Sequence, residues 1–342
     1  MSRGSLPRYI LARIGLMIPM MLVLLTLVFL LLRVAPGDPI TAAVGGKLDP
    51  VVIEARRESL GLNRPLIVQY LEYLWQVARF DFGQTISDNR PIIEIIRDNG
   101  GATLTLTIGA FLIALGIGIP LGLVAGRARD SVRDVVIRLF GVVTYAAPIF
   151  FVGLMMQMFV ARPLGFPTSG IANPRTQFTV ATKPITHILL IDAALQGNTQ
   201  ALGDILLHHV LPCLTLGLLI CGVFIRLVRV NLLQTLQADY VEAARARGIH
   251  ESRVVRKHAF RNALVPVVTV IGLQAAMLLG GAVLTEKTFN WPGLGTQLVH
   301  YISARDYIGV QGLVTFFAVI VVMISLVVDV INALIDPRVR YS

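Results

Sequence analysis

The chain has few charged residues. Of its 342 residues, 15% are Asp, Glu, Lys or Arg and 55% are hydrophobic. Soluble domains carry about 25% charged residues, so the deficit indicates that much of the folded surface does not face water. Several runs approach the ~20 uncharged apolar residues that are typical of bilayer-crossing helices. The short alternating segments of a membrane β-barrel do not occur.

Side chains for bond chemistry are also scarce. The two cysteines, Cys213 and Cys221, lie about 12 Å apart along a helix, which exceeds the reach of a disulfide, so we expect buried thiols. No HExxH or GxSxG motif is present, and we expect no metal site. No acidic residue, His or Arg falls near the middle of a predicted span, which argues against a proton- or sodium-coupled carrier.

Six apolar spans are predicted, and the expected fold is an all-α polytopic membrane protein. They cover Ile10–Leu32, Ala102–Gly126, Val135–Val160, His209–Ile225, Ala263–Thr285 and Ile308–Val328. The fourth span is short. The glycines of the second span permit close helix packing, although they would equally leave room for a solute; they are Gly109, Gly116, Gly118 and Gly122.

The orientation follows from the basic residues between the spans. The net charge of +10 is explained by the excess of Lys and Arg in cytoplasmic loops, without nucleic acid as a partner. The basic residues that fall on one side are Arg3, Arg8, Arg127, Arg129, Arg133, Arg226, Arg229, Arg245, Arg247, Arg253, Arg256, Lys257, Arg261, Arg338 and Arg340. Both termini are therefore predicted inside. The charged segment Val34–Gly101 is long enough to cross regardless of its charge.

The predicted organisation has four parts. They are an N-terminal tail with the first transmembrane helix (1–34), an external helical module (35–100), a five-helix transmembrane core (101–335) with a cytoplasmic loop (231–262), and a cytoplasmic C-terminal tail (336–342). Pro36, Gly37 and Asp38 form a turn cluster that ends the first span. Helical patterns follow Asp49 and cover Leu66–Phe80.

The cytoplasmic loop carries the most informative motif. It reads Asp239-Tyr240-Val241-Glu242-Ala243-Ala244-Arg245-Ala246-Arg247-Gly248. Asp239 with Glu242 three residues later is a capping-box pattern that predicts a helix start, and Gly248 predicts a left-handed end. Ala243, Ala244 and Ala246 leave a thin surface that would fit a groove on a partner. A second helix is predicted over Glu251–Leu264.

This loop resembles the EAA loop of ATP-binding-cassette import permeases, and more closely that of the dipeptide, oligopeptide and nickel permease family. The matching residues run from Tyr240 to Gly248 and continue at Arg261, Asn262 and Pro266. Other matching stretches are Arg33–Pro39, Leu60–Pro65, Asp81–Gly83, Glu286–Gly295 with its Trp291-Pro292-Gly293, Arg305–Tyr307 and Asp336–Arg338. His250 stands where the family often has Ser.

The resemblance implies a permease subunit of an ATP-driven importer in a bacterial cytoplasmic membrane. It implies that this chain is not an enzyme and holds no cofactor, because ATP and Mg are bound by two partner ATPase subunits. The helix at 239–248 would couple to an ATPase, with Glu242 paired either there or locally with Arg245. The other implied partners are a second homologous permease, an extracytoplasmic substrate-binding protein that meets the outer segments including Trp291, and lipid.

The implied solute stays open among dipeptides, oligopeptides, glutathione, nickel chelates and haem. Two other functions compete with the importer. One is a stand-alone secondary carrier or channel, and the other is a membrane scaffold without transport.

Overall fold

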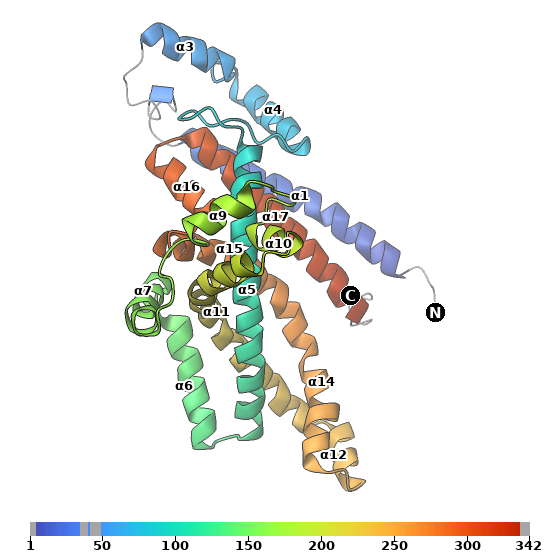
Figure 1. The fold of residues 1–342 in the computed structure, drawn as a ribbon. Coiled ribbons are helices and arrows are strands. Elements are labelled where there is room, and N and C mark those ends of the chain that lie inside the picture. The colour runs from blue at the N-terminus through green and yellow to red at the C-terminus, as the bar shows by residue number, and fades with distance from the viewer. Residues whose placement is uncertain (1–4, 35–39, 42–48, 336–342) are drawn as a thin grey trace.

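The computed structural model describes residues 5–34, 40–41 and 49–335 (Figure 1). Every named element in these residues is a helix. The centre is formed by α5 (Ile92–Arg127) and α11 (Thr199–Leu236), which pack along their length. Contacts of Gly109 with Cys213 and of Gly126 with Leu232 show that the two helices run parallel. Parallel neighbours cross a membrane in the same direction, as expected for a second and a fourth span.

Four described helices are long and apolar enough to cross a membrane: α1 (Ser5–Val34), α5, α11 and α17 (Tyr307–Ile335). Two further spans are formed if bent helix pairs are each counted as one. The first pair joins α6 (Val132–Ala146) to the helical run of α7 (Ile149–Met155), η1 (Met156–Ala161) and α8 (Arg162–Leu164), at 109°. The second lies within α15 (Val265–Thr288), at 46°. The structure thus contains four to six candidate spans.

The predicted third span is not one straight helix. The chain bends at Ala147, which has an extended backbone (ψ 133°) and precedes Pro148. Proline disfavours the helical conformation of the residue before it and cannot donate a backbone hydrogen bond. The apolar run therefore turns where a hydrophobicity pattern sees continuity.

The predicted fourth span is also wrong in its limits. Instead of His209–Ile225, α11 spans Thr199–Leu236 with Pro212 inside it, and the Asn198 side chain accepts from the Ala201 backbone N–H at its start. Arg226 and Arg229 therefore belong to a membrane-length helix and not to the loop after it. Similarly, α5 begins at Ile92, so the boundary predicted at residue 101 falls inside a helix.

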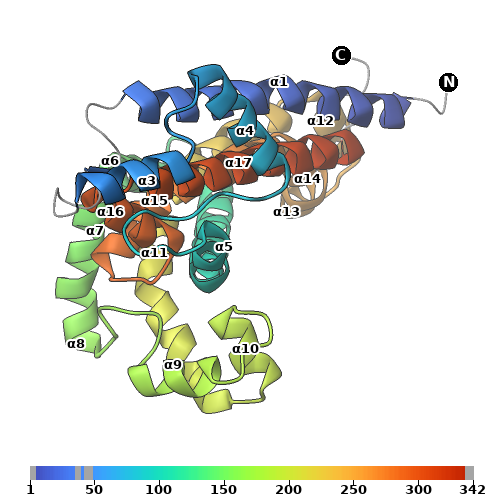
Figure 2. The same ribbon diagram turned by 90° about the horizontal axis from the view of Figure 1, so that it is seen from above.

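The first and last long helices pack against each other. α1 and α17 lie side by side in both ribbon views (Figures 1 and 2). Arg13, near the start of α1, pairs with Asp329, near the end of α17, at 3.4 Å. The two helices are therefore antiparallel, and the chain enters α1 and leaves α17 at the same side of the molecule.

The helical module after α1 matches its prediction. Asp49 caps α3 (Pro50–Ser59) by accepting from the Val51 N–H at 3.0 Å, and α4 (Leu66–Ala78) follows. Figure 2 shows both on the α1 side of the molecule, away from α9 (Pro174–Ala181) and α10 (Leu189–Leu195). The turn residues Pro36, Gly37 and Asp38 and the tail 336–342 lie outside the described residues.

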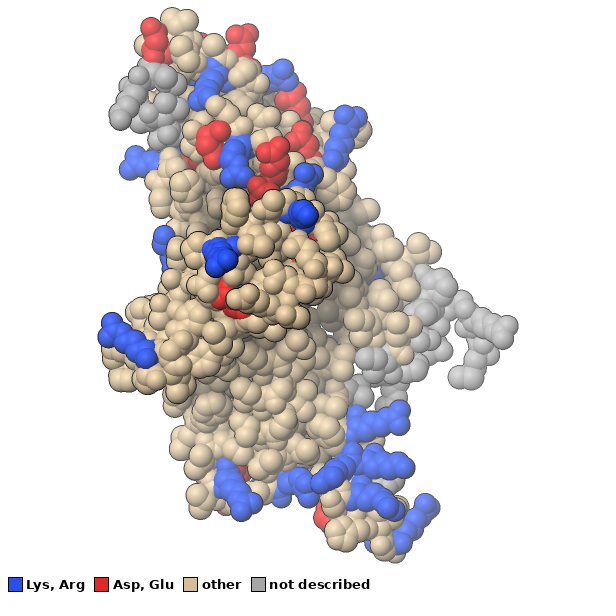
Figure 3. All heavy atoms as spheres, viewed as in Figure 1, with Lys and Arg blue, Asp and Glu red and all other residues tan. Residues whose placement is uncertain are grey.

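Charge is distributed along the long axis of the molecule. In Figure 3, Lys and Arg gather at the end that carries α12 (Asp239–Ala246), and both signs mix at the opposite end, which carries α3 and α4. Between them the displayed face is largely uncharged. This pattern places the predicted coupling helix at the basic end.

Candidate functional site: a seated helix and a basic cavity

The predicted coupling helix exists as α12, but its start differs from the prediction by one residue. Ala238, and not Asp239, is the N-cap, and no side chain caps it. Asp239 and Glu242 lie in the first turn, where a carboxylate is favourable near the positive end of the helix dipole. The capping-box interpretation of Asp239 is therefore wrong, although the helix occupies the predicted residues.

The end of α12 matches its prediction. Gly248 has φ +72°, and its N–H donates to the Arg245 carbonyl at 2.9 Å. The next N–H, of Ile249, donates to the Ala244 carbonyl at 3.3 Å. This paired arrangement is a Schellman motif, which needs a left-handed residue at the position of Gly248. The helix thus ends abruptly, and the chain turns back under it.

One face of α12 is held by a small apolar core. Val241 and Ala244 are buried there, and the Ala244 side chain is not part of any outward surface. Their neighbours come from the end of α11, from η2 (Val254–Ala259) and from α14 (Phe260–Ala263); the buried ones are Leu232, Val254, Val255, Ala259 and Ala263. Since α14 leads directly into α15, the core that seats α12 joins the end of α11 to the start of α15.

Polar contacts fix the same unit. Arg245 makes a two-pronged pair with Glu251 of α13 (Glu251–Arg253), at 3.0 and 2.8 Å. The guanidinium beside it holds the pKa of the Glu251 carboxyl below its usual value. The Tyr240 hydroxyl accepts from the Asn262 amide at 2.9 Å. His250 caps the next helix, since its Nδ1 accepts from the Ser252 N–H at 3.3 Å, in place of the family's Ser.

The outward face of α12 is left polar and open. Its exposed residues are Asp239, Tyr240, Glu242, Ala243, Arg245, Ala246 and Arg247, with Gly248 at the end. Arg245 pairs with Glu251 and not with Glu242. Within the described chain the Glu242 carboxylate makes no hydrogen bond or ion pair. Arg261 and Pro266, from the matching stretch that follows, are also exposed, at the approach to α15.

The predicted outer motif Trp291-Pro292-Gly293 lies inside the chain. Trp291 is fully buried and donates from Nε1 to the Ala102 carbonyl at 2.9 Å. The Pro292 carbonyl accepts from the Asn99 amide at 3.0 Å. A Cβ at Gly293 would collide with the Glu286 carboxyl. The motif therefore joins the end of α15 to α5, and the Trp291 side chain offers no surface to a second protein in this conformation.

Buried Glu286 completes this outer junction. Its carboxylate accepts from the Thr103 hydroxyl at 2.6 Å and from the Thr296 N–H at 2.9 Å. Thr296 belongs to α16 (Leu294–Ser303). The predicted fifth span ended at Thr285, so Glu286 was placed in the loop that follows. Its partners lie on two other helices, α5 and α16. Only the small residues around it, Gly293 and Gly295, signalled a close approach.

Three of the four glycines of α5 take the packing role, one of the two roles left open by the sequence. Added Cβ atoms at Gly109, Gly118 and Gly122 would collide with α11, at 2.6, 2.7 and 2.8 Å from its nearest atoms. These three therefore permit helix packing. Gly116 is exposed and nothing lies within 4 Å of its Cβ position, so it faces away from the described core.

A cavity of about 630 Å³ lies between α6, α11 and α15. Arg138, Arg226 and Arg229 line it together with apolar side chains. At its edge the buried Asp134 carboxylate accepts from Arg229 Nε and Nη2 at 2.6 and 2.7 Å. The sequence missed this site because Asp134 and Arg229, 95 residues apart, are brought together only in the fold.

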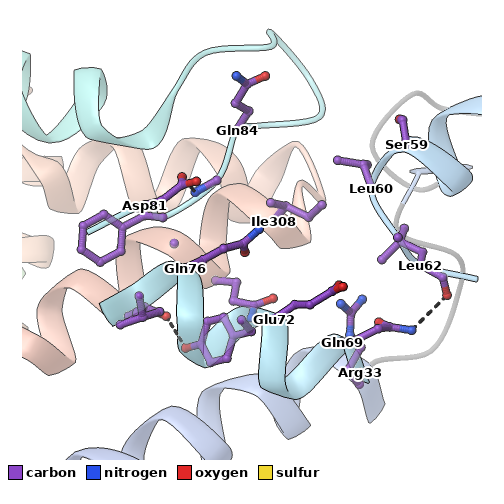
Figure 4. Close-up of a pocket in the computed structure, with 18 residues that line it drawn as sticks. Arg33, Ser59, Leu60, Leu62, Gln69, Glu72, Gln76, Asp81, Gln84 and Ile308 are labelled. Carbon is purple, nitrogen blue, oxygen red and sulfur yellow. Dashed lines mark hydrogen bonds between the residues drawn. The ribbon is translucent and has the colours of Figure 1, made fainter. Parts of the chain in front are cut away.

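A smaller pocket of about 200 Å³ lies between the module, the end of α1 and the start of α17 (Figure 4). Arg33 of α1, Gln69, Glu72 and Gln76 of α4 and Asp81 surround it. Arg33 Nε and Gln69 Oε1 are buried without a hydrogen-bond partner in the described structure. Its wall thus combines charges of both signs with apolar side chains such as Phe82 and Ile308. No group of three or more metal-ligating acidic, His or Cys side chains occurs among the residues described.

The described structure is an apolar helical bundle with membrane-length helices and a short, partly seated helix at its basic end. In a comparison with known families, residues 118–341 match the binding-protein-dependent transport system inner membrane component, and residues 6–107 match the N-terminal region of that membrane component. The chain belongs to this family, whose members are permease subunits of ATP-binding-cassette importers.

Curated relatives match the chain over almost its whole length. The dipeptide transport system permease protein of Escherichia coli (strain K12) is 37% identical over 337 residues, covering 98% of this chain and 99% of the relative. The di/tripeptide transport system permease protein of Pseudomonas aeruginosa is 37% identical over 336 residues, with the same coverage. The glutathione transport system permease protein of Salmonella typhi is 36% identical over 335 residues, covering 98% and 99%.

Proposed function

We propose that this chain forms half of the translocation path of an importer for dipeptides, oligopeptides or related small solutes. The relatives named for dipeptide, di/tripeptide and glutathione transport support the substrate class, because they match along the whole chain. In this proposal a second, homologous permease forms the other half. An extracytoplasmic binding protein delivers the solute to the end that carries α3 and α4.

The proposed membrane arrangement has six spans with both termini in the cytoplasm. The parallel packing of α5 and α11, the antiparallel packing of α1 and α17 and the basic end at α12 (Figure 3) support it. The proposed division is an external module between α1 and α5, a transmembrane core from α5 to residue 335 and a cytoplasmic tail at 336–342.

Two ATPase subunits, which hold ATP and Mg, are proposed to supply the energy through α12. The observation that carries this proposal is a helix closed at its end by a Schellman motif, with one face seated on its own core and the other open. A helix in a groove is a common mode of recognition, and a stiff seated element transmits the motion of a docked partner as a unit. In this role Glu242 pairs with a basic ATPase residue, flanked by Asp239, Ala243, Ala246 and Arg247.

The test is ATP-dependent peptide uptake by proteoliposomes that contain the full complex. Glu242→Ala removes an exposed, unpaired carboxylate without disturbing the core under α12. We expect uptake to fall roughly tenfold, as for loss of one charge-assisted contact, with the ATPase co-purifying less well. The matched control is Glu58→Ala, an exposed carboxylate on α3 at the opposite end, which leaves ATPase retention unchanged.

Two results would contradict the proposal. Unchanged assembly and uptake in Glu242→Ala would contradict the proposal that α12 couples to the ATPase. Uptake by the purified chain alone, driven by an ion gradient without ATPase subunits, would identify a secondary carrier instead.

A further inference from the structure

We propose that the cavity between α6, α11 and α15 binds the carboxylate of the transported solute, and that Arg226 is the residue that contacts it. This inference rests on the proposed import function and adds a solute-recognition site within the membrane subunit. It concerns the last part of the path, before release to the cytoplasm.

The first argument is an imbalance of charge. Three guanidinium groups line the cavity, from Arg138, Arg226 and Arg229, and its described wall contains no carboxylate. Asp134, at the edge, is fully buried and binds Arg229 through both oxygens. Arg138 lies 3.4 Å from the same carboxylate. One acid is therefore shared by two cations, and the third cation is left over.

Arg226 is that third cation. It is exposed in the chain and lines the cavity, and it makes no ion pair or hydrogen bond with any described residue. It lies on α11, a membrane-length helix. An ionised side chain in a span is costly against lipid and normally faces a water-filled path or a charged partner. The position of Arg226 thus indicates an aqueous cavity that holds an anion.

The surroundings favour a small organic anion. The wall between the arginines is largely apolar, with Val142, Tyr145 and Met277 exposed to it, and the Gln274 amide adds a neutral polar group. The volume of about 630 Å³ falls in the ordinary range for small-molecule sites. Low-dielectric walls strengthen the attraction for an anion, and the planar guanidinium fork matches a carboxylate through two parallel hydrogen bonds.

The cavity is also linked to the coupling helix. Arg226 stands about 15 Å along α11 from Leu236, at the helix end, and Leu236 packs on the core that seats α12. Arg229 ties α11 to α6 through Asp134. A displacement of α12 that moves α11 relative to α6 therefore changes the spacing of the three arginines. Such a change would weaken the hold on the carboxylate when the solute has to leave.

The experiment compares two peptides that differ only in this group. Proteoliposomes with the full complex receive the same binding protein loaded with a tripeptide or with its C-terminal amide. The measured quantity is the ratio of initial uptake rates, acid over amide. Because the binding protein is identical in every arm, its own preference cancels when this ratio is compared between permease variants.

We expect Arg226→Gln to lower the acid-to-amide ratio roughly tenfold relative to wild type, which corresponds to one charge-assisted hydrogen-bonded pair. The matched control is Arg133→Gln, an exposed arginine on α6 that does not line the cavity, and its ratio stays at the wild-type value. Arg226→Lys keeps the charge and loses the fork, so it gives an intermediate ratio even if the glutamine variant fails to assemble.

Several outcomes would overturn the inference. One is a wild-type ratio in both Arg226 variants, and another is an equal loss of acid and amide uptake. A third comes from vesicles made with and without phosphatidylglycerol: an Arg226-dependent response to that lipid with an unchanged ratio assigns the cavity to a lipid phosphate. If wild-type vesicles show no ATP-dependent uptake at all, the import function itself fails, which is a separate result.

Discussion

At the scale of single residues, Gly248 decides how α12 ends. Its φ of +72° is left-handed, and no atom lies within 4 Å of a Cβ placed there. Gly248→Ala therefore adds backbone strain of about 1 kcal/mol without a steric clash. We expect faster hydrogen exchange at the amides of 239–249 in the solubilised chain, as the Schellman hydrogen bonds open more often.

The control for this change is Gly280→Ala. That position also has open space around its Cβ, but it lies within α15, where alanine is favoured over glycine by up to ~1 kcal/mol. Equal exchange in the two variants would mean that the left-handed turn does not hold α12.

Sequence reasoning identified backbone requirements better than side-chain environments. The end of α12 at Gly248 followed from a local rule, because only the backbone decides it. The burial of Ala244 and Trp291 depends on which face meets another helix, which the motif alone does not specify. For Asp239, a one-residue shift of the helix start turned an expected cap into a first-turn residue. Matches to a family motif therefore located the segments correctly but not the direction of each side chain.

At the scale of elements, the ion pair of Asp134 with Arg229 joins α6 to α11. Asp134 is completely buried, and the arginine side chain is 15% exposed. Removing one partner of a buried pair leaves the other uncompensated and costs about 3–5 kcal/mol. We expect Asp134→Asn to lower the thermal unfolding temperature of the detergent-solubilised chain by several degrees.

A neighbouring acid provides the comparison. Asp130 is exposed and pairs with the exposed Arg129 at 3.1 Å, and such surface pairs contribute at most ~1 kcal/mol. Asp130→Asn should therefore leave the unfolding temperature within a degree or two. If both variants unfold alike, the buried pair does not hold the two helices together.

The fourth span illustrates why the ends of a helix were harder to predict than the presence of an apolar run. Hydrophobicity ends at Ile225, so Arg226 and Arg229 were assigned to a loop. The helix continues because Asp134 satisfies Arg229 from another helix and because Leu232 and Leu236 pack on the core under α12. Neither partner is adjacent in sequence. The 109° bend after α6, in contrast, has a local cause in Pro148. A hydrophobicity average over many residues does not detect a single proline.

At the scale of the whole molecule, helix directions constrain the topology more strongly than span counts. α5 and α11 are parallel, and α1 and α17 are antiparallel. A six-span chain satisfies both relations, since its second and fourth spans cross in one direction and its first and last in opposite directions. The apolar runs predicted the same six-span order, and the loop charges predicted which ends face the cytoplasm. Neither prediction used the packing of one helix on another, so the two lines of reasoning are independent.

This topology predicts that the two ends of the molecule are labelled from opposite sides. The native Cys213 and Cys221 are buried and provide a low background for single-cysteine probes. Glu58→Cys on α3 should react with a membrane-impermeant maleimide in intact cells. Arg247→Cys beside α12, and Arg8→Cys near the start of α1, should react only after permeabilisation, because the basic end is predicted to face the cytoplasm.

The control is a helix-buried position, Ala114→Cys on α5, which should stay unlabelled in both conditions and shows that the reagent does not enter the bundle.

Labelling of Glu58→Cys and Arg247→Cys from the same side would rule out an odd number of crossings between them. Labelling of Arg8→Cys in intact cells would leave α12 inside but place the N-terminus outside. That pattern requires an odd number of crossings between Arg8 and Arg247, and it would show that the bent pair formed by α6 and the run from α7 to α8, which lies between them, does not span the membrane.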